Sequence, residues 1–294
     1  MTSQTSRTPG HDLPTPEGRQ SKPTEIDELI DLHFHRPLAG RVVRILAQTP
    51  VTPNQVTVFA GLLGVLAGAV LWCYGADPKM RLGAALLLLS SAILDCADGQ
   101  LARLKNISST TGAILDGISD YFVGFAIFLG VMHTAAELTQ SSWVWWFGFF
   151  AAFSTAAQCG LYDQMKLRYV RAVGLAYQER EEDLDRVAYQ RMQARQRGDY
   201  KTILLLWVYE KYTLAQRAAL TEPVAEDPVA FRRENRLKMR AWTMIGIGTH
   251  LLCFYVTIAL SYFWPSALLA SLFIFATLMN VILVYLWTHD WRRE

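Results

Sequence analysis

Charged residues are scarce in this sequence, and long stretches contain none. Asp, Glu, Lys and Arg make up 18% of the 294 residues, whereas hydrophobic residues make up 52%. A soluble globular protein carries about 25% charged residues. The apolar residues also gather into runs of about 20, the length at which a helix crosses the hydrocarbon core of a membrane. The composition excludes an ordinary soluble domain and predicts an all-α integral membrane protein.

Cysteine is also rare, and its spacing excludes the common metal and redox motifs. None of the four cysteines forms a CxxC pair, and each lies in or beside an apolar run: Cys73, Cys96, Cys159 and Cys253. This pattern favours small buried hydrophobic side chains over a disulfide or a metal site. The net charge of +2 says little about partners, and we expect no nucleic acid among them.

The N-terminal part of the chain divides into two segments of different character. Residues 1–23 lack the apolar run that a signal peptide requires, and we expect them to form a disordered tail. Residues 24–50 combine apolar residues at helical spacing with Arg36, Arg41 and Arg44. That combination is typical of an amphipathic helix lying in the headgroup layer. A helix packed on the rest of the protein remains the alternative.

Six apolar segments predict six transmembrane helices within residues 51–294. We expect them near Val56–Tyr74, Leu82–Leu104, Gly112–Thr134, Trp143–Tyr162, Ala241–Tyr262 and Pro265–Trp287. Residues 163–240 are highly charged and predict an insertion of two or three surface helices. Because Lys and Arg concentrate in the termini and the even-numbered loops, the positive-inside rule places these parts in the cytoplasm. We therefore expect a multi-pass protein of the bacterial inner (cytoplasmic) membrane, with its active site facing the cytoplasm.

Four carboxylates lie at the ends of two of these apolar segments. Asp95 and Asp98 are three residues apart, and Asp116 and Asp120 are four residues apart. On a helix, both spacings place the two side chains of a pair on one face. A charged side chain inside a membrane costs about 2.5–3.5 kcal/mol on insertion scales. Four converging acids therefore need counter-charge, and oxygen ligands favour Mg²⁺, Mn²⁺ or Ca²⁺ over Zn²⁺.

The residues around these acids follow the spacing D-x2-D-G-x2-A-R-x8-G-x3-D-x3-D. Its fixed positions are Asp95, Asp98, Gly99, Ala102, Arg103, Gly112, Asp116 and Asp120. The pattern resembles the signature of the CDP-alcohol phosphotransferases, also called CDP-alcohol phosphatidyltransferases, which are integral membrane enzymes of phospholipid synthesis. The Thr-Pro-Asn at 52–54 and the layout of an interfacial helix followed by six spans are also similar to that family. The resemblance covers residues 24–169 well and the last two spans in outline.

This resemblance implies a transferase that moves a substituted phosphate from a CDP-linked donor to an alcohol hydroxyl and releases CMP. Asp95, Asp98 and Asp116 are the candidate metal ligands. Two divalent cations, Mg²⁺ or Mn²⁺, held about 3.5–4 Å apart could clamp the attacking and leaving oxygens. The resemblance implies that Asp120 is the general base and that it also contacts a metal.

Several residues near the acids are candidates for binding the substrates. Gly99, Ala102 and Gly112 have little or no side chain and would let a nucleotide lie against the helices. Arg103 can pair with the pyrophosphate through its planar guanidinium, and Asn54 is a candidate nucleotide contact. The candidates for binding an anionic acceptor, which alternatively anchor the membrane edge, are Lys166, Arg168 and Arg171.

The sequence leaves open which partner carries the lipid. We favour CDP-diacylglycerol with a small polar acceptor such as glycerol phosphate, inositol, inositol phosphate or serine. The alternative is transfer from CDP-choline or CDP-ethanolamine to diacylglycerol. An intramembrane prenyltransferase is more remote because its acids lie in two separated motifs. An ion-coupled transporter is also remote because transporters tend to show internal repeats, which this chain lacks. The resemblance also implies a homodimer.

Overall fold

The computed structural model describes residues 23–107, 110–173, 177–200 and 225–289, together with 202–204, 206, 207, 209, 210 and 214. The helices are α1 (Arg36–Leu46), α2 (Pro53–Tyr74), α3 (Pro78–Lys105), α4 (Thr110–Thr139), α5 (Trp143–Ala172), α6 (Tyr177–Arg197), α8 (Pro228–Trp242), α9 (Ile247–Leu260), α10 (Ala267–Phe273) and α11 (Met279–Thr288). Short turns are η2 (Thr24–Ile26), η3 (Asp31–His35), η4 (Thr243–Ile245) and η5 (Ile274–Leu278). These ranges contain no strand, so the all-α prediction is confirmed for them. The predicted tail, apart from Pro23, lies outside the described residues.

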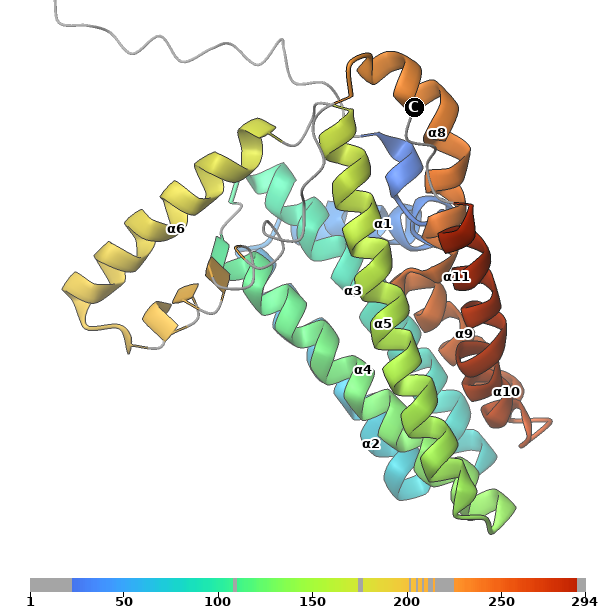
Figure 1. Ribbon diagram of the computed structural model, residues 1–294. Coiled ribbons are helices and arrows are strands. Elements are labelled where there is room, and N and C mark those ends of the chain that lie inside the picture. Colours follow the sequence, from blue (N-terminus) through green and yellow to red (C-terminus); the bar gives the residue numbers. More distant parts are fainter. Residues whose placement is uncertain are drawn as a thin grey trace, which may run out of the picture.

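Within the described residues, four helices are long and apolar enough to cross a membrane. They are α2, α3, α4 from Ile114 onward, and the continuous helix Ala267–Thr288 that joins α10, η5 and α11. The pair formed by Pro228–Ile245 and Ile247–Leu260 would be a fifth, bent by 42° at its break. Helix α5 is not among these candidates because its composition is less apolar, although it runs alongside the bundle from end to end (Figure 1). The described part of the chain therefore contains four or five candidate spans, whereas the sequence predicts six.

The predicted fifth span is not one continuous helix. Its backbone is extended at Gly246 (ψ 169°), between η4 and α9. The carboxylate of Glu28, from the N-terminal segment, accepts hydrogen bonds from the backbone N–H groups of Gly248 (3.1 Å) and Thr249 (2.8 Å). A carboxylate at this position satisfies unpaired donors and opposes the positive end of the helix dipole. The helix restarts at Ile247 because a distant part of the chain caps it.

Helices α2, α3 and α4 pack closely because small residues line their contacts. A Cβ added at Gly68 of α2 would overlap the backbone of Ala126 on α4, and a Cβ at Gly130 of α4 would overlap the backbone of Gly68. Such small residues let the backbones of membrane helices approach. Ser91 of α3 donates a hydrogen bond to the carbonyl of Ala60 on α2 (2.8 Å). These contacts determine how α3 and α4 each pack against α2.

The N-terminal helix is continuous from residue 29 to Leu46. Pro37 does not break it, because the preceding turn η3 is a π-helix in which the N–H of Arg36 bonds to the carbonyl of Asp31. A π turn shifts the hydrogen-bond register and so accommodates the missing N–H of proline. Helix α1 packs against α3, with Ala39 and Val43 buried between them.

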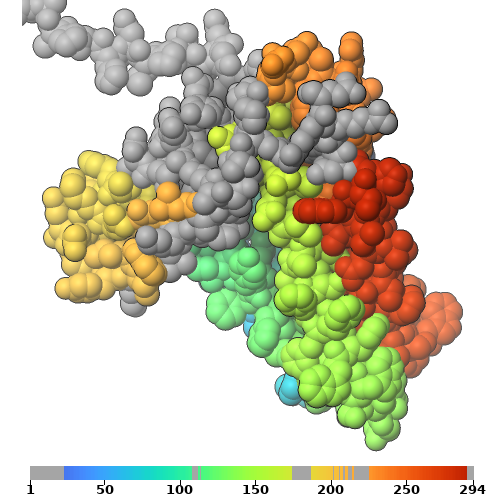
Figure 2. Space-filling view, in the orientation of Figure 1, coloured from blue at the N-terminus to red at the C-terminus, as the bar shows by residue number. Residues whose placement is uncertain are grey.

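Helix α5 continues to Ala172 and so extends into the range 163–240 that the sequence predicts as an insertion. Helix α6 then stands apart from the bundle, shown in yellow in Figure 2. Val187 of α6 and Leu206 pack with Ile114 of α4 in a small buried cluster. In Figure 1 the insertion, α1 and α8 lie at one end of the bundle, and α10 lies at the other. The insertion therefore contacts the end of α4 that carries two of the predicted acids.

Candidate active site

Three of the four predicted acids meet between α3 and α4. Asp95 and Asp98 project from the C-terminal half of α3, and Asp116 projects from the second turn of α4. One carboxylate oxygen of each residue lies within 4.8 Å of the others. Asp95 and Asp116 are close enough for their carboxyl groups to interact directly. The two helices that carry the motif, α3 and α4, thus bring three carboxylates together as one compact group of oxygen ligands.

Asp120 lies one turn beyond Asp116 on α4 and outside this group of three. Its carboxylate is close enough to those of Asp98 and Asp116 for their charges to interact. The carboxylate of Asp163, near the end of α5, also acts on Asp120. Asp163 is not among the predicted site residues. It is an acid at the end of an apolar run, which is the signal that identified the other four.

Thr57 is a second residue that sequence reasoning missed. Its buried side chain on α2 donates a hydrogen bond to the carboxylate of Asp98, which is also buried. The capping box of Thr52 and Gln55 starts α2, with Pro53 at its first position, and thereby places Thr57 one turn inside the helix. The Thr-Pro-Asn segment was the available signal, because Thr57 follows it by a single turn.

The three carboxylates fit divalent cations of the hard, oxygen-binding class. All donors are oxygens, which Mg²⁺ and Mn²⁺ prefer. The Oδ1 atom of Asp116 is buried and has no hydrogen-bond partner among the described residues. A buried carboxylate oxygen without a donor is costly. A cation coordinated by Asp95, Asp98 and Asp116 would remove that cost.

Two of the candidate nucleotide-binding residues, Gly99 and Arg103, lie beside Asp98 of this group. A Cβ added at Gly99 would lie 3.7 Å from a guanidinium nitrogen of Arg103, which is one turn further along α3 and exposed. The charge of Arg103 also acts on Asp98. Ala102 and Gly112 are half-buried, and Asn54 is exposed in the first turn of α2. Gly99, which has no side chain, thus lies beside the carboxylate of Asp98 and the guanidinium of Arg103.

The candidate acceptor-binding residues occupy the last turns of α5. Lys166 lies over the ring of Tyr162, with its Nζ 5.6 Å from the ring centroid, and its charge acts on Asp163. Arg168 Nη1 is 4.0 Å from the sulfur of Met165. Arg171 is half-buried one turn further on. Lys166 is therefore linked to the acids through Asp163, which neighbours Asp120.

Lys105, at the end of α3, has a role that the sequence did not indicate. Its Nζ donates hydrogen bonds to the carbonyls of Thr49 (2.7 Å) and Val51 (2.8 Å). Those carbonyls belong to the loop between α1 and α2. Lys105 therefore holds the start of α2, and with it Thr57, against the helix that carries Asp98.

Two glutamates outside the spans attach the N-terminal segment near this site. Burial raises the pKa of Glu25, but hydrogen bonds from Arg232 (2.6 Å) and Tyr169 (2.8 Å) outweigh burial and lower the pKa overall. Burial and the nearby charge of Asp31 raise the pKa of Glu28 to about 7. Glu25 thus joins the segment to α5 and α8, and Glu28 joins it to α9.

Residues 50–180 match the family model described as CDP-alcohol phosphatidyltransferase. The matched range contains α2 to α5 and all four predicted acids. The resemblance inferred from the motif is therefore confirmed over residues 50–180.

Individual relatives match 91 to 124 residues of the chain. The chain is 34% identical over 121 residues to a bifunctional IPC transferase and DIPP synthase of Thermococcus kodakarensis, covering 41% of this chain and 26% of that protein. It is 32% identical over 91 residues to an archaetidylinositol phosphate synthase of Pyrococcus horikoshii, covering 31% of this chain and 46% of that protein. It is 28% identical over 124 residues to inner membrane protein YnjF of Escherichia coli, covering 40% and 55%. The chain thus matches about a quarter to half of the length of these relatives.

Proposed function

We propose that this protein transfers a substituted phosphate from a CDP-linked donor to an alcohol hydroxyl and releases CMP, as an enzyme of phospholipid synthesis. The observation that carries the proposal is the convergence of Asp95, Asp98 and Asp116 within 4.8 Å. This convergence lies inside the range that matches a family of such transferases. A membrane site of this kind gives a lipid substrate and a water-soluble substrate access to the same acids.

Asp95, Asp98 and Asp116 would hold two divalent cations, Mg²⁺ or Mn²⁺. When bound, such cations neutralise the charge that develops on the reacting and leaving phosphate oxygens. Thr57 would keep Asp98 oriented toward the other acids through its hydrogen bond. A ligand held in one rotamer loses less entropy when the cation binds.

Asp120 would act as the general base, because it lies one turn from the ligand group. It would take the proton from the acceptor hydroxyl, whose oxygen forms a new bond to the donor phosphorus. The bond between that phosphorus and the CMP oxygen then breaks, and CMP leaves. Arg103 would pair with the pyrophosphate through its planar guanidinium. Gly99, Ala102, Gly112 and Asn54 would leave room for, or contact, the cytidine part of the donor.

We favour CDP-diacylglycerol as donor and an anionic polar alcohol as acceptor. Lys166, Arg168 and Arg171 give the end of α5 three positive charges near the acids. One relative is named an archaetidylinositol phosphate synthase, which makes inositol phosphate the first acceptor to test. Transfer from CDP-choline or CDP-ethanolamine to diacylglycerol remains the second candidate, because the family match does not distinguish the two.

We also propose that α5 and residues 241–262, which contain α9, cross the membrane, which gives six spans. Trp143 and Trp146 are exposed in the first turn of α5, as expected for a helix that starts at a membrane–water boundary. The cytoplasm would face the end that carries Arg103 and Lys166. The N-terminal helix would lie in the headgroup layer, with exposed Phe34 and Ile45 toward the lipid. A homodimer remains part of this proposal.

A matrix of donors and acceptors tests the proposal. The purified protein in lipid nanodiscs with Mg²⁺ is mixed with CDP-diacylglycerol, CDP-choline or CDP-ethanolamine, and with each candidate acceptor. CMP release and product-lipid mass are measured together. We expect both signals with CDP-diacylglycerol and inositol phosphate, and neither with the Asp120→Asn variant. Activity only with CDP-choline or CDP-ethanolamine and diacylglycerol would support the second candidate. No CMP from any combination would refute the proposed reaction.

A further inference from the structure

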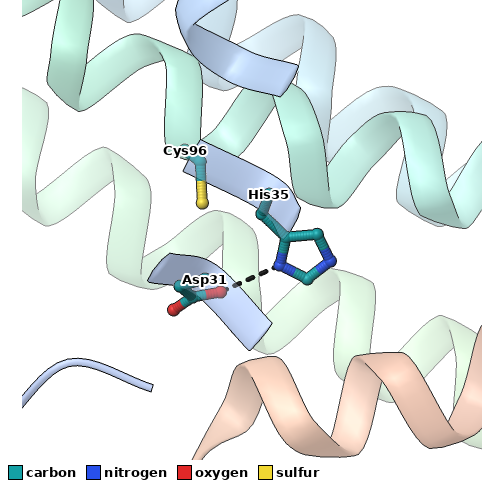
Figure 3. Close-up of side chains that lie close together, drawn as sticks. All are labelled: Asp31, His35 and Cys96. Carbon is teal, nitrogen blue, oxygen red and sulfur yellow. Dashed lines mark hydrogen bonds and ion pairs between the residues drawn. The ribbon is translucent and has the colours of Figure 1, made fainter. Parts of the chain in front are cut away.

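A second cluster of metal-binding side chains lies between the N-terminal segment and α3. Asp31 and His35, both from η3, face Cys96 of α3 (Figure 3). One ligand atom from each residue lies within 4.8 Å of the others. The Nδ1 atom of His35 is 2.8 Å from Oδ1 of Asp31. His35 is buried, whereas Asp31 and Cys96 are half-buried.

We propose that Asp31, His35 and Cys96 bind a divalent cation of the zinc class at a site separate from the four acids. A carboxylate oxygen, an imidazole nitrogen and a thiolate sulfur are the donors that Zn²⁺ takes in proteins. Magnesium and manganese prefer oxygen ligands and do not favour thiolate. The two groups of side chains therefore select different ions, although Cys96 is the residue next to Asp95. Three protein ligands leave a fourth position for water.

The distances are close to those that the cation requires. With ordinary zinc bond lengths, tetrahedral ligands lie about 3.4 Å apart for nitrogen and oxygen and about 3.6 Å apart when one is sulfur. The pair of Asp31 and His35 would open from 2.8 Å by about 0.6 Å. The sulfur of Cys96, within 4.8 Å of both, would approach by at most about 1.2 Å. The larger of the two changes is about 1.2 Å.

The surroundings of the site support a bound cation. With Nδ1 on the metal, the proton of neutral His35 would sit on Nε2, which lies 3.3 Å from the hydroxyl of Tyr255. Such an outer partner orients a metal-binding imidazole. Cys96 would lose its proton when the cation binds, so binding releases a proton to solvent. Asp31 and the Cys96 thiolate together would balance a charge of +2.

The neighbouring charged groups already have partners of their own. Arg36 donates to the carboxylate of Asp27 at 2.7 Å. Glu28 accepts hydrogen bonds from the start of α9. The cation would therefore join η3 to α3 directly behind Asp95, and its effect would be to hold the N-terminal segment against the helix that carries the acids.

Cobalt is a suitable probe because it replaces zinc and reports a sulfur ligand spectroscopically. The purified full-length protein is stripped with chelator and then titrated with Co²⁺. We expect a thiolate-to-metal charge-transfer band in the near ultraviolet with about one equivalent bound. The band should be absent in Cys96→Ser and strongly reduced in His35→Gln. It should persist in Cys253→Ser, which removes another half-buried cysteine, and in Asp116→Asn, which alters the acid group.

A second measurement separates metal binding from damage to the fold. Zn²⁺ should raise the unfolding temperature of the stripped protein and of Asp116→Asn, but not that of Cys96→Ser. A wild-type protein that binds Co²⁺ without the band would show binding by the acids alone and overturn the proposal. A band that survives in Cys96→Ser would overturn it equally. Neither readout depends on transferase activity, so failure here leaves the proposed function untouched.

Discussion

The hydroxyl of Thr57 on α2 donates a hydrogen bond to the carboxylate of Asp98 on α3. Both side chains are buried, and the two residues lie 41 positions apart in the sequence. The bond fixes the orientation of one acid in the group of three. It also makes the geometry of that group depend on how α2 sits against α3.

Replacing Thr57 with Val should weaken activity while leaving the fold intact. The substitution keeps the branched shape of the side chain and removes one hydrogen bond to a charged group, which is worth about 1.5–3 kcal/mol. If that free energy is lost from Mg²⁺ binding, half-maximal CMP release should need an Mg²⁺ concentration about tenfold to hundredfold higher. Thr57→Ser keeps the hydroxyl group and should need an Mg²⁺ concentration close to that of wild type.

Ser91→Ala is the matched control for Thr57→Val. It removes a hydrogen bond of 2.8 Å from the same α2–α3 interface, but toward the carbonyl of Ala60 and not toward an acid. It should lower the unfolding temperature without changing the Mg²⁺ requirement. An unchanged Mg²⁺ requirement in Thr57→Val would show that Thr57 does not orient a metal ligand.

Removal of divalent cations should abolish the reaction reversibly. Asp95, Asp98 and Asp116 converge within 4.8 Å, and without cations their charges are unbalanced. We expect EDTA to stop CMP release, and Mg²⁺ or Mn²⁺ to restore it. In Asp116→Asn, no added cation should restore more than about a thousandth of the rate, since one ligand of the group is lost. Full activity in an exhaustively chelated, metal-free sample would exclude this mechanism.

Gly68→Ala should destabilise the protein by forcing α2 and α4 apart. The added methyl group would overlap the backbone of Ala126, which cannot move without moving the helix. Overpacking of this kind costs about 1–3 kcal/mol, which corresponds to several degrees in the unfolding temperature. Gly83→Ala on α3 is the control, because a Cβ there meets nothing within 4 Å. It should be neutral or slightly stabilising, and equal destabilisation by both variants would argue against close α2–α4 packing.

The sequence predicts well what depends on spacing along one helix, and poorly what depends on contacts between distant segments. The i,i+3 spacing of Asp95 and Asp98 predicts one shared face of α3, and in the structure that face meets Asp116 of α4. The i,i+4 spacing also predicts Asp120 in the same group, but Asp120 lies outside the three. Thr57 was missed because its partner is fixed only when α2 packs on α3. The break at Gly246 was missed for the same reason, because Glu28 supplies the cap from 220 positions away.

Composition does not describe what an individual side chain faces at the edge of the membrane. Cys96, predicted to be a small buried hydrophobic side chain, is a free, half-buried cysteine packed against an apolar cluster that includes Ala39 and Val43. In the structure it faces Asp31 and His35, which come from the N-terminal segment. Hydropathy describes the average environment of a segment, whereas the chemistry of one side chain depends on what packs against it.

The stability of the protein should depend on Arg232 in a pH-dependent way. Burial raises the pKa of Glu25, but hydrogen bonds from Arg232 and Tyr169 lower it overall from its ordinary value of 4.5. A carboxylate with a lowered pKa in the folded state stabilises that state above its ordinary pKa, and this contribution is lost as the pH falls below it. Because Arg232 is nearly half exposed, we expect Arg232→Ala to cost about 0.5–1 kcal/mol at neutral pH. The unfolding temperature is measured from pH 7 down to about pH 3.5.

The test of this prediction is the difference in unfolding temperature between wild type and Arg232→Ala. That difference should be constant above about pH 5 and should shrink as the pH falls below 4.5, because protonated Glu25 no longer gains from the arginine. Arg236→Ala removes an exposed arginine from the same helix and should give a small difference that does not change in this range. In Glu25→Gln, as in Arg232→Ala, the unfolding temperature should fall less steeply than in wild type as the pH drops below 4.5. A difference that instead stays constant or grows on acidification would mean that Arg232 does not lower the pKa of Glu25 in the folded protein.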